Sequence, residues 1–214
     1  MQNEVNVLSY LKTNKFNNSI LYQLLINNIE NRIQLTENEK ELFLSYLTDK
    51  KIKRRDFFIK EGEPNTSIAF VLSGCMRSYK MDQNGHEHIL QFAIEDWWIS
   101  DVTSFVDQKP GDIAIDAIEN SHLALLPRDA QLELFDRCPK FERYFRILSE
   151  IGIATYQKRI LENISLTATE RYENFAKRYP FFVQRLPQNQ IAAYLGITPE
   201  FLSKIRHQNM QKKY

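Results

Sequence analysis

Polar and basic side chains recur at helical spacing near the carboxyl end of the chain. The segment LPQNQIAAYLGITPEFLSKIRH, residues 186–207, has the pattern of two short helices joined by a tight turn. Pro187 is pre-set for a first helical turn, and Gly196 stands where a helix commonly ends in a left-handed residue. Thr198 can cap the next helix through its hydroxyl, with Pro199 at that helix's first position. The segment therefore predicts a helix-turn-helix.

The second helix of this segment presents side chains that could contact DNA. Its expected outer face consists of Pro199, Glu200, Ser203, Lys204, Arg206 and His207. A helix-turn-helix places such a face in the major groove, where Glu200 could accept from a cytosine amino group and Lys204 could reach guanine. The expected core beneath consists of Ile191, Ala192, Leu195, Ile197, Leu202 and Ile205. An ordinary helical hairpin is the alternative interpretation.

Other residues with chemical potential do not form a recognisable catalytic or metal site. His86 and His88 lie on one face of an expected strand, but no third metal ligand is evident, which favours a solvent-facing strand. The chain has no GxSxG, HExxH or P-loop pattern, so we expect no enzyme and no catalytic residue. Cys75 and Cys138 are far apart and fit reduced thiols in a cytoplasm rather than a disulfide or an iron–sulfur site.

Composition and charge favour a globular protein with a basic terminal module. The 214 residues are 43% hydrophobic and 26% charged, and no segment has the ~20 apolar residues of a membrane span. The segment from Ser165 onward has eight basic and three acidic residues, a net charge of +5. Because the whole chain carries +1, residues 1–164 carry −4. Such a distribution suits phosphate contact, although a solvated surface could show it by chance.

The middle of the chain has the two-residue alternation of short strands. The expected strands are Phe57–Lys60, Ile68–Leu72, Met76–Met81, His88–Ala93, Ile113–Ile118 and Leu123–Leu126. Turn signals separate them, and Asn84-Gly85 is a strong hairpin signal because both residues tolerate positive φ. Strands this short and evenly spaced favour an antiparallel barrel or roll. Before them, the basic run Lys50, Lys51, Lys53, Arg54 and Arg55 is typical of a solvated edge, with phosphate contact as the alternative.

Helical periodicity frames the roll on both sides. Thr36 to Glu39 forms a capping-box pattern that opens a helix to about Leu47. Further helices are expected over Asp129–Phe135, Pro139–Asn163 and Ala168–Tyr179. The long one has more apolar residues than one contact needs, which predicts helix–helix dimerisation; packing within one subunit is the alternative. The expected divisions are an N-terminal helical extension over 1–35, a roll over 36–135, a dimerisation helix over 136–164 and the helix-turn-helix domain over 165–214.

This order of elements resembles the CRP/FNR family of bacterial transcription regulators, in the form common in Bacteroidetes. The resemblance covers residues 36–209 and rests on the segments IKEGEP (59–64), FVLSGCMRSY (70–79), KFERYFRIL (140–148), TERYENFAKRYP (169–180) and the helix-turn-helix. It implies an α+β protein with a cyclic-nucleotide-binding-like jelly roll, a long dimerisation helix and a winged-helix-like C-terminal domain. It also implies a cytoplasmic homodimer on palindromic double-stranded DNA, RNA polymerase as a further partner, and no membrane.

The resemblance assigns DNA-contacting roles to eight residues. It implies contacts to bases or phosphates from Pro199, Glu200, Ser203 and Lys204, with Gln188 and Thr198 on the DNA backbone. Arg206 and His207 complete the expected face. Well-known family members have arginine where Pro199 stands, so the target sequence should differ.

The family's ligand residues are altered in this chain. Members that bind cyclic nucleotides hold the ribose with a Gly-Glu pair and the cyclic phosphate with an arginine. The corresponding stretch here, EDWWISDVTSFVDQKPGDIAIDAIE, has Trp97, Trp98, Asp101, Gly111, Asp112 and Ile113 at the effector positions. Without a cationic partner a buried phosphate is costly, so we expect no tight cAMP binding and no cofactor. Trp97 and Trp98 either fill the roll, which we favour, or line a pocket for an unidentified small molecule.

Two functions stay open at this point. The first is a dimeric, sequence-specific DNA-binding transcription regulator with a degenerate effector pocket. The alternative is a small-molecule sensor or interaction module whose helix-turn-helix no longer binds DNA specifically. The basic C-terminal charge favours the first, and the short tail after Ile205 mildly favours the second.

Overall fold

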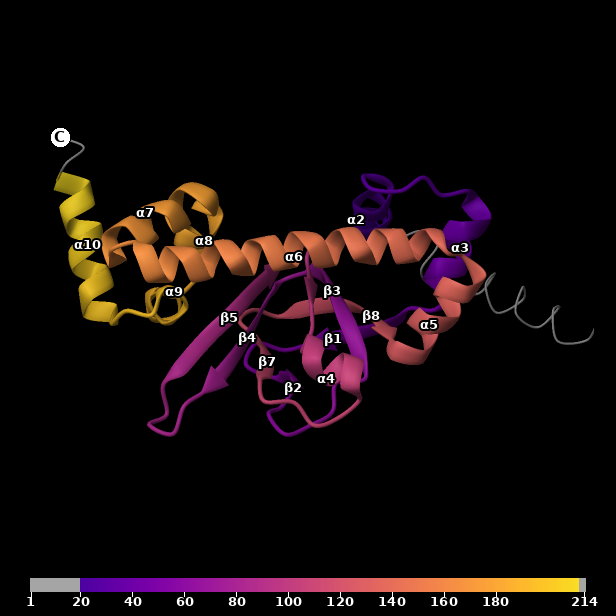
Figure 1. Cartoon of the computed structure of the whole chain (residues 1–214), viewed down its shortest axis with the longest axis horizontal. Coiled ribbons are helices and arrows are strands. Elements are labelled where there is room, and N and C mark those ends of the chain that lie inside the picture. Colours follow the sequence, from indigo (N-terminus) through magenta and orange to yellow (C-terminus); the bar gives the residue numbers. More distant parts are fainter. Residues whose placement is uncertain (1–19, 212–214) are drawn as a thin grey trace, which may run out of the picture.

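The computed structural model describes residues 20–211, which form a β-roll, a long helix and a helical C-terminal domain (Figure 1). The expected residues 1–19 of the N-terminal extension, and Lys212 and Lys213 of the basic tail, lie outside the described residues. Each of the two antiparallel sheets has four strands. The first has the order β1 (Thr48–Ile52), β8 (Ser121–Pro127), β3 (Ser67–Ser73), β6 (Trp98–Ile99). The second has the order β2 (Phe57–Ile59), β7 (Ala114–Ala117), β4 (Cys75–Met81), β5 (Glu87–Ile94).

Alternating apolar residues from both sheets fill the space between them. Ala69 and Val71 of β3 meet Met76 of β4, Ile115 of β7 and Leu123 of β8 in one buried cluster. Because successive side chains of a strand point to opposite faces, the residues that alternate with these point to the outer faces of the sheets. Each outer face therefore needs a covering layer of its own.

Helices cover the outer face of the first sheet. They are α2 (Ile20–Glu30), α3 (Glu37–Ser45), α5 (Arg128–Arg137) and the first part of α6 (Lys140–Ser165). The rings of Phe43 on α3 and Phe141 on α6 stack at 4.9 Å between centroids. Thr36 and Glu39 form the expected capping box at the start of α3. The helix α2 thus packs on the roll through residues such as Leu25 and Ile29, which are fully buried.

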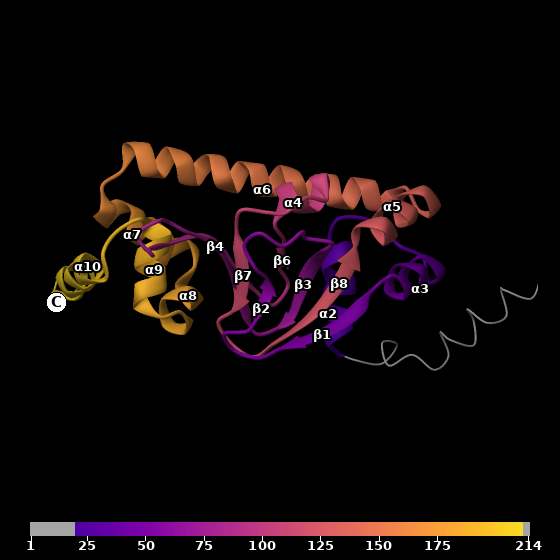
Figure 2. The same cartoon turned by 90° about the horizontal axis from the view of Figure 1, so that it is seen from below.

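The helix α6 spans the length of the molecule and leads to the C-terminal domain (Figures 1 and 2). After Leu166, Thr167 and Glu170 form a second capping box that starts α7 (Ala168–Arg178). Three further helices follow: α8 (Pro180–Arg185), α9 (Gln188–Leu195) and α10 (Pro199–Gln211). Regular structure within residues 168–211 is entirely helical, so the described part of this domain has no β-wing.

The C-terminal domain packs against the outer face of the second sheet. Phe92 on β5 contacts the rings of Phe182 on α8 and Tyr194 on α9, with centroids 5.6 and 5.4 Å apart. Arg159 on α6 adds hydrogen bonds to the carbonyls of Ile89, at 2.6 Å, and Tyr194, at 2.8 Å. The two domains therefore share one apolar core.

The structure confirms all six expected strands and adds elements that the sequence pattern concealed. The added elements are β1, β6, α8 and the six-residue helix α4 (Val102–Asp107). The hairpin at Asn84-Gly85 is confirmed, with Gly85 at a positive φ of 81°. Asp82 closes this loop by accepting from the backbone N–H groups of Asn84, at 2.8 Å, and His86, at 2.9 Å.

Candidate nucleic-acid interface and effector region

The turn between α9 and α10 has the local chemistry that the sequence predicts. Gly196 ends α9 in the left-handed conformation with φ 66°. The Thr198 hydroxyl oxygen accepts from the backbone N–H of Phe201 at 3.2 Å, which caps α10. One difference is that Pro187 stands just before α9 rather than inside its first turn. Two helices are thereby held at a fixed crossing, as a helix-turn-helix requires.

A small apolar core fixes the two helices against each other. Ile191, Ala192 and Leu195 of α9 are buried against Leu202 and Ile205 of α10. Ala192 has no exposed surface, so a larger side chain there would push the helices apart. The expected core is confirmed, with Ile197 partly buried at its edge.

The outer face of α10 presents the expected side chains. On α10 the exposed residues are Pro199, Glu200, Ser203, Lys204 and His207, while Arg206 is half-buried. Gln188 at the start of α9 and Thr198 in the turn are exposed as well. Hydrogen bonds from its own backbone N–H and from Thr198 hold the pKa of Glu200 below its usual value. Glu200 is therefore an anionic acceptor at neutral pH. Sequence reasoning missed Phe201, whose ring is 44% exposed beside Glu200 and adds apolar surface to this face.

Part of the basic charge of the C-terminal domain is used inside the protein, which corrects the expectation from composition. Arg178 forms an ion pair with Glu162 of α6 at 2.5 Å. Arg171 donates to the carbonyls of Leu166 and Leu195. These side chains bind carboxylates and carbonyls of the folded chain, so they are not free for phosphate. For contact with phosphate, the cations of α10 and its surroundings therefore matter more than the total number of basic residues in the domain.

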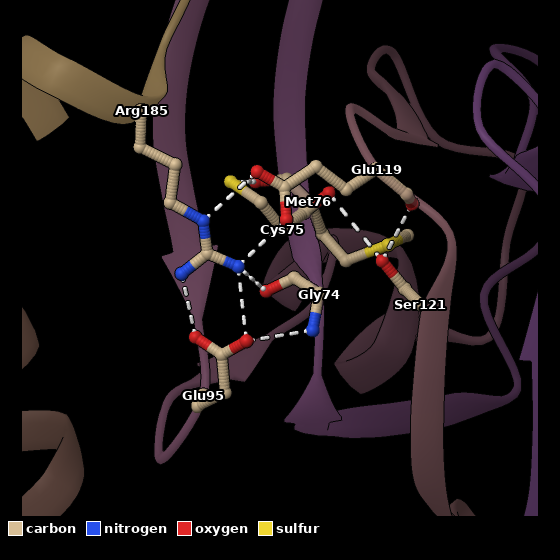
Figure 3. Close-up of polar contacts among 7 residues, drawn as sticks. All are labelled: Gly74, Cys75, Met76, Glu95, Glu119, Ser121 and Arg185. Atoms are coloured by element: carbon tan, nitrogen blue, oxygen red, sulfur yellow. Dashed lines mark hydrogen bonds and ion pairs between the residues drawn. The ribbon is translucent and has the colours of Figure 1, made fainter.

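Arg185 joins the C-terminal domain to the roll through an ion-pair cluster (Figure 3). Its guanidinium donates to Glu95 at 2.7 and 2.9 Å, to Glu119 at 2.7 and 2.9 Å, and to the carbonyl of Gly74 at 2.9 Å. Hydrogen bonds to Glu119 and Glu95 raise the pKa of Arg185. We call this set, Arg185 with Glu95, Glu119 and the Gly74 carbonyl, the interdomain clamp. All three nitrogens of the guanidinium take part in these five hydrogen bonds.

The second half of α6 carries an apolar stripe that the chain itself leaves uncovered. Ile153, Tyr156, Ile160 and Ile164 follow one another at spacings of three and four residues, and 47–78% of each is exposed. Residues at these spacings share one face of a helix. Within residues 20–211, no helix combines the length and the apolar composition that a membrane span requires.

The short helix α4 and the loop after it fold tightly on themselves. Asp101 is 5% exposed, and its Oδ1 accepts from the backbone N–H of Ser104 at 3.1 Å to cap α4. Its Oδ2 has no hydrogen-bond partner among the described residues. Gly111 lies directly against this carboxylate, since a Cβ atom added there would overlap Oδ2. The structure thus brings Asp101 and Gly111 together and leaves no room between them.

His86 and His88 converge on one carboxylate without forming a metal centre. Both contact Oδ2 of Asp82, at 3.4 and 3.1 Å. Hydrogen bonds from the His86 backbone and the His88 ring lower the pKa of Asp82. Across residues 20–211, no group of three or more His, Cys, Asp or Glu side chains is arranged to hold a metal ion.

Comparison with known proteins identifies the roll. Residues 49–138 match the cyclic nucleotide-binding domain family. The anaerobic regulatory protein of Haemophilus influenzae is 27% identical over 189 residues, 81% of this chain and 72% of that protein. The transcriptional activator protein Anr of Pseudomonas aeruginosa is 24% identical over 165 residues, 72% of this chain and 67% of that protein.

Solved structures share the whole arrangement of roll, long helix and C-terminal domain. FixK2 from Bradyrhizobium japonicum superposes with a TM-score of 0.67 at 20% identity, covering 78% of this chain and 86% of that one. The catabolite activator protein of Thermus thermophilus gives 0.52 at 20% identity, covering 84% and 85%. The chain is therefore similar in sequence and fold to transcription regulators of the CRP/FNR family, and its roll matches the cyclic nucleotide-binding domain family.

A cyclic nucleotide does not fit the residues that this chain has at the expected effector positions. The place of the phosphate-binding arginine is taken by Gly111, where no side chain has room beside Asp101. The neighbouring side chain is Asp112, which is exposed and anionic rather than cationic. A buried phosphate would meet two carboxylates here, which is strongly unfavourable.

The two tryptophans of this chain pack in different hydrophobic clusters, so they do not line one pocket together. Trp98 packs at the first sheet, and its Nε1 donates to the Tyr144 hydroxyl at 2.8 Å. Trp97 contacts the rings of Tyr179 and Phe182 in the C-terminal domain, with centroids 6.0 and 5.9 Å apart. Trp98 fills space in the core of the roll, as expected, whereas Trp97 forms an interdomain contact that sequence reasoning missed.

A buried arginine was also missed. Arg77 on β4 is 8% exposed, and it donates to Asp116 on β7 at 2.7 and 2.9 Å and to Glu87 on β5. Burial would lower the pKa of Arg77, but the bonds to Asp116 and Glu87 outweigh it and raise the pKa. Its charge is fully compensated by these carboxylates. The alternation of β4 places residue 77 on the sheet face opposite Met76, which was the available signal.

Both cysteines of this chain are buried free thiols. Burial raises the pKa of Cys75 to about 12. Burial also raises the pKa of Cys138, and the neighbouring Glu39 carboxylate raises it further. These thiols are protonated at neutral pH and lie in different parts of the roll.

Proposed function

We propose that this chain is a homodimeric, sequence-specific DNA-binding transcription regulator. The observation that carries the proposal is the intact α9–turn–α10 unit, whose core is closed and whose outer face presents Glu200, Ser203 and Lys204 to solvent. A helix-turn-helix of this geometry inserts its second helix into the major groove. The names of the relatives, which are regulators of transcription, support the same function.

Dimerisation follows from the apolar stripe on α6. Ile153, Tyr156, Ile160 and Ile164 would bury their exposed side chains against the same stripe of a second copy, in the manner of a two-stranded coiled coil. A symmetric pair of α6 helices places one α10 on each side of the two-fold axis. The two recognition helices would then meet a palindrome in successive major grooves.

The regulator works without cAMP in this proposal. The collapsed contact between Asp101 and Gly111, together with the exposed Asp112, opposes a cyclic phosphate. The clamp and the shared aromatic core hold the C-terminal domain against the roll through contacts between this chain's own residues. DNA binding is therefore expected from the purified protein alone.

Capture of genomic fragments tests this function. The purified protein is mixed with sheared genomic DNA of its source organism, and the retained fragments are sequenced. The proposal expects a small number of sharply enriched loci that share an inverted repeat. Uniform recovery across the genome, at any salt concentration that retains DNA, would show non-specific binding only and would overturn it.

A further inference from the structure

The turn between β1 and β2 carries a dense group of cations that the protein does not use itself. Lys53, Arg54 and Arg55 form this turn, and Lys51 precedes it on β1; we call these four residues the basic turn. All four side chains are exposed, and within residues 20–211 none of them forms an ion pair or a hydrogen bond. Some other surface cations are paired; Lys140, for example, forms an ion pair with Glu39.

The backbone of the basic turn is held firmly in place. The N–H of Arg54 donates to Oδ1 of Asn120 at 2.9 Å, and the N–H of Arg55 donates to the Ala117 carbonyl at 2.7 Å. The N–H of Asp56 closes the turn on the Lys53 carbonyl at 3.0 Å. The cations are therefore presented from a fixed position rather than from a loose loop.

Arg55 adopts a backbone conformation that glycine would adopt more easily. Its φ is 73°, in the left-handed region where a side chain clashes with its own backbone. Gly62, Gly74, Gly85 and Gly196 fill comparable positions elsewhere in the chain. A strained conformation of this kind, held by an arginine without an internal partner, is a common mark of a functional position.

The basic turn lies next to the start of the helix-turn-helix. Arg54 lines a surface cleft of about 360 Å³ together with Arg185 and with Pro187, the residue that immediately precedes α9. In a helix-turn-helix the first helix crosses the DNA backbone, and its free N–H groups favour phosphate. Phosphates near Gln188 would therefore run toward Arg54 and its neighbours.

We propose that the basic turn is a second DNA-contacting surface, which binds the phosphate backbone beside each half-site. This inference rests on the proposed function, since it extends the same DNA interface from the C-terminal domain onto the roll. It requires cations without internal partners, a fixed backbone and proximity to α9, and the basic turn has all three. Contacts of this kind add affinity and salt dependence but no sequence preference.

The double variant Arg54→Gln/Arg55→Gln tests the proposal on a selected operator. Binding is measured by fluorescence anisotropy over a range of salt, on a duplex of about 40 base pairs and on one trimmed to the half-sites, about 20 base pairs. The variant should bind the long duplex about tenfold more weakly, with a salt slope smaller by about 2. Trimming should weaken the wild-type protein and leave the variant unchanged.

A matched control removes the same charge from the opposite end of β2. Lys60 and Lys109 are exposed, and the bond from the Gly62 N–H to the Gly111 carbonyl places their loops together, away from Arg55. The variant Lys60→Gln/Lys109→Gln should bind both duplexes as the wild type does. The proposal would be overturned if both double variants kept the affinity and the salt slope of the wild type. Loss of the same size in both would overturn it too, because that outcome indicates net charge rather than a site.

The single variant Arg55→Gly separates DNA contact from folding. Glycine relieves the left-handed strain, so the melting temperature should stay the same or rise while affinity for the long duplex falls. Unchanged affinity together with an unchanged or higher melting temperature would contradict the proposal. If the wild-type protein selects no operator at all, the proposed function itself fails. If the wild type selects an operator and the basic-turn variant binds that operator equally tightly, only this inference is refuted.

Discussion

Arg185 of α8 and Glu119 of the roll are joined by two hydrogen bonds of 2.9 and 2.7 Å, although 66 residues separate them in the chain (Figure 3). The same guanidinium reaches Glu95 from the other side. This contact lies directly before α9, so the position of the helix-turn-helix relative to the roll depends on it. The clamp thus connects the roll with the helix-turn-helix domain.

Replacing Arg185 should destabilise the protein. Arg185→Ala leaves Glu95 and Glu119 facing each other without a cation; because the three side chains are about one third exposed, we expect a loss of about 2 kcal/mol in the free energy of unfolding. The melting temperature should fall by about 6 °C. Lys177→Ala removes an exposed cation of the neighbouring helix α7 and should change neither quantity. Equal melting temperatures for Arg185→Ala and Lys177→Ala would contradict the structural role of the clamp.

The clamp should weaken in acid. Burial alone would raise the pKa of Glu95, but hydrogen bonds from Arg185 and from backbone N–H groups outweigh it and hold the pKa below the usual 4.5. A lowered folded-state pKa means that the ionised group stabilises the fold above pH 4.5, and that this contribution disappears as pH falls through the folded-state value. The difference in melting temperature between the wild type and Glu95→Gln should be present at pH 7 and shrink below pH 4.5. A difference that grows with acidification would show the opposite sign.

An acidic residue in the apolar stripe should prevent dimerisation. Ile160→Glu places a charge at the centre of the proposed α6 contact, where burial is unfavourable. Analytical ultracentrifugation should give a dimer for the wild type and a 25.4 kDa monomer for the variant. Thr155→Glu adds the same charge on an exposed position about 140° around the helix and should stay dimeric. A variant Ile160→Glu that remains dimeric would exclude this stripe as the interface.

Lys204 should carry part of the sequence preference. Lys204→Ala removes an exposed cation of the α10 outer face, so binding to a selected operator should weaken by about 1–3 kcal/mol with relaxed preference at one base pair. Lys177→Ala, in the same domain, should show neither effect. Unchanged specific affinity of Lys204→Ala would remove this residue from the base-reading set.

Cyclic AMP should not stabilise the folded protein. A ligand that binds only the native state raises stability by about 2.7 kcal/mol at a hundred times its Kd. Because Asp101 and Asp112 stand where a phosphate would need a cation, the melting temperature in millimolar cAMP should equal that in buffer. A rise of several degrees would show that a cyclic nucleotide binds despite these carboxylates.

Local patterns in the sequence predicted local structure well. Alternation located six strands, and Gly196, Thr198 and Pro199 located the turn of the helix-turn-helix to the residue. The strand β1 escaped because four of its five residues are exposed at the sheet edge, so TDKKI has no apolar alternation. The helix α8 escaped because six residues are too few for a helical period.

Contacts between domains could not be predicted from periodicity. The residues of the clamp come from four separate elements, and their charges look like ordinary surface charges in the sequence. Trp97 was expected to fill the roll or to line a pocket, and the structure places it against Tyr179 of the C-terminal domain instead. In both cases the partner lies more than 60 residues away, which a window of local sequence does not include.

Selection from a random DNA pool, using the purified protein without added ligand, tests the central claim most directly. We predict recovery of an inverted repeat whose half-sites are about ten base pairs apart, centre to centre, because two α10 helices related by a two-fold axis enter successive major grooves. Recovery of that palindrome by the wild type, and its loss with Ile160→Glu, would support a dimeric regulator that is active without cAMP. A pool that stays random after repeated rounds, with and without cell extract, would contradict sequence-specific DNA binding by this chain.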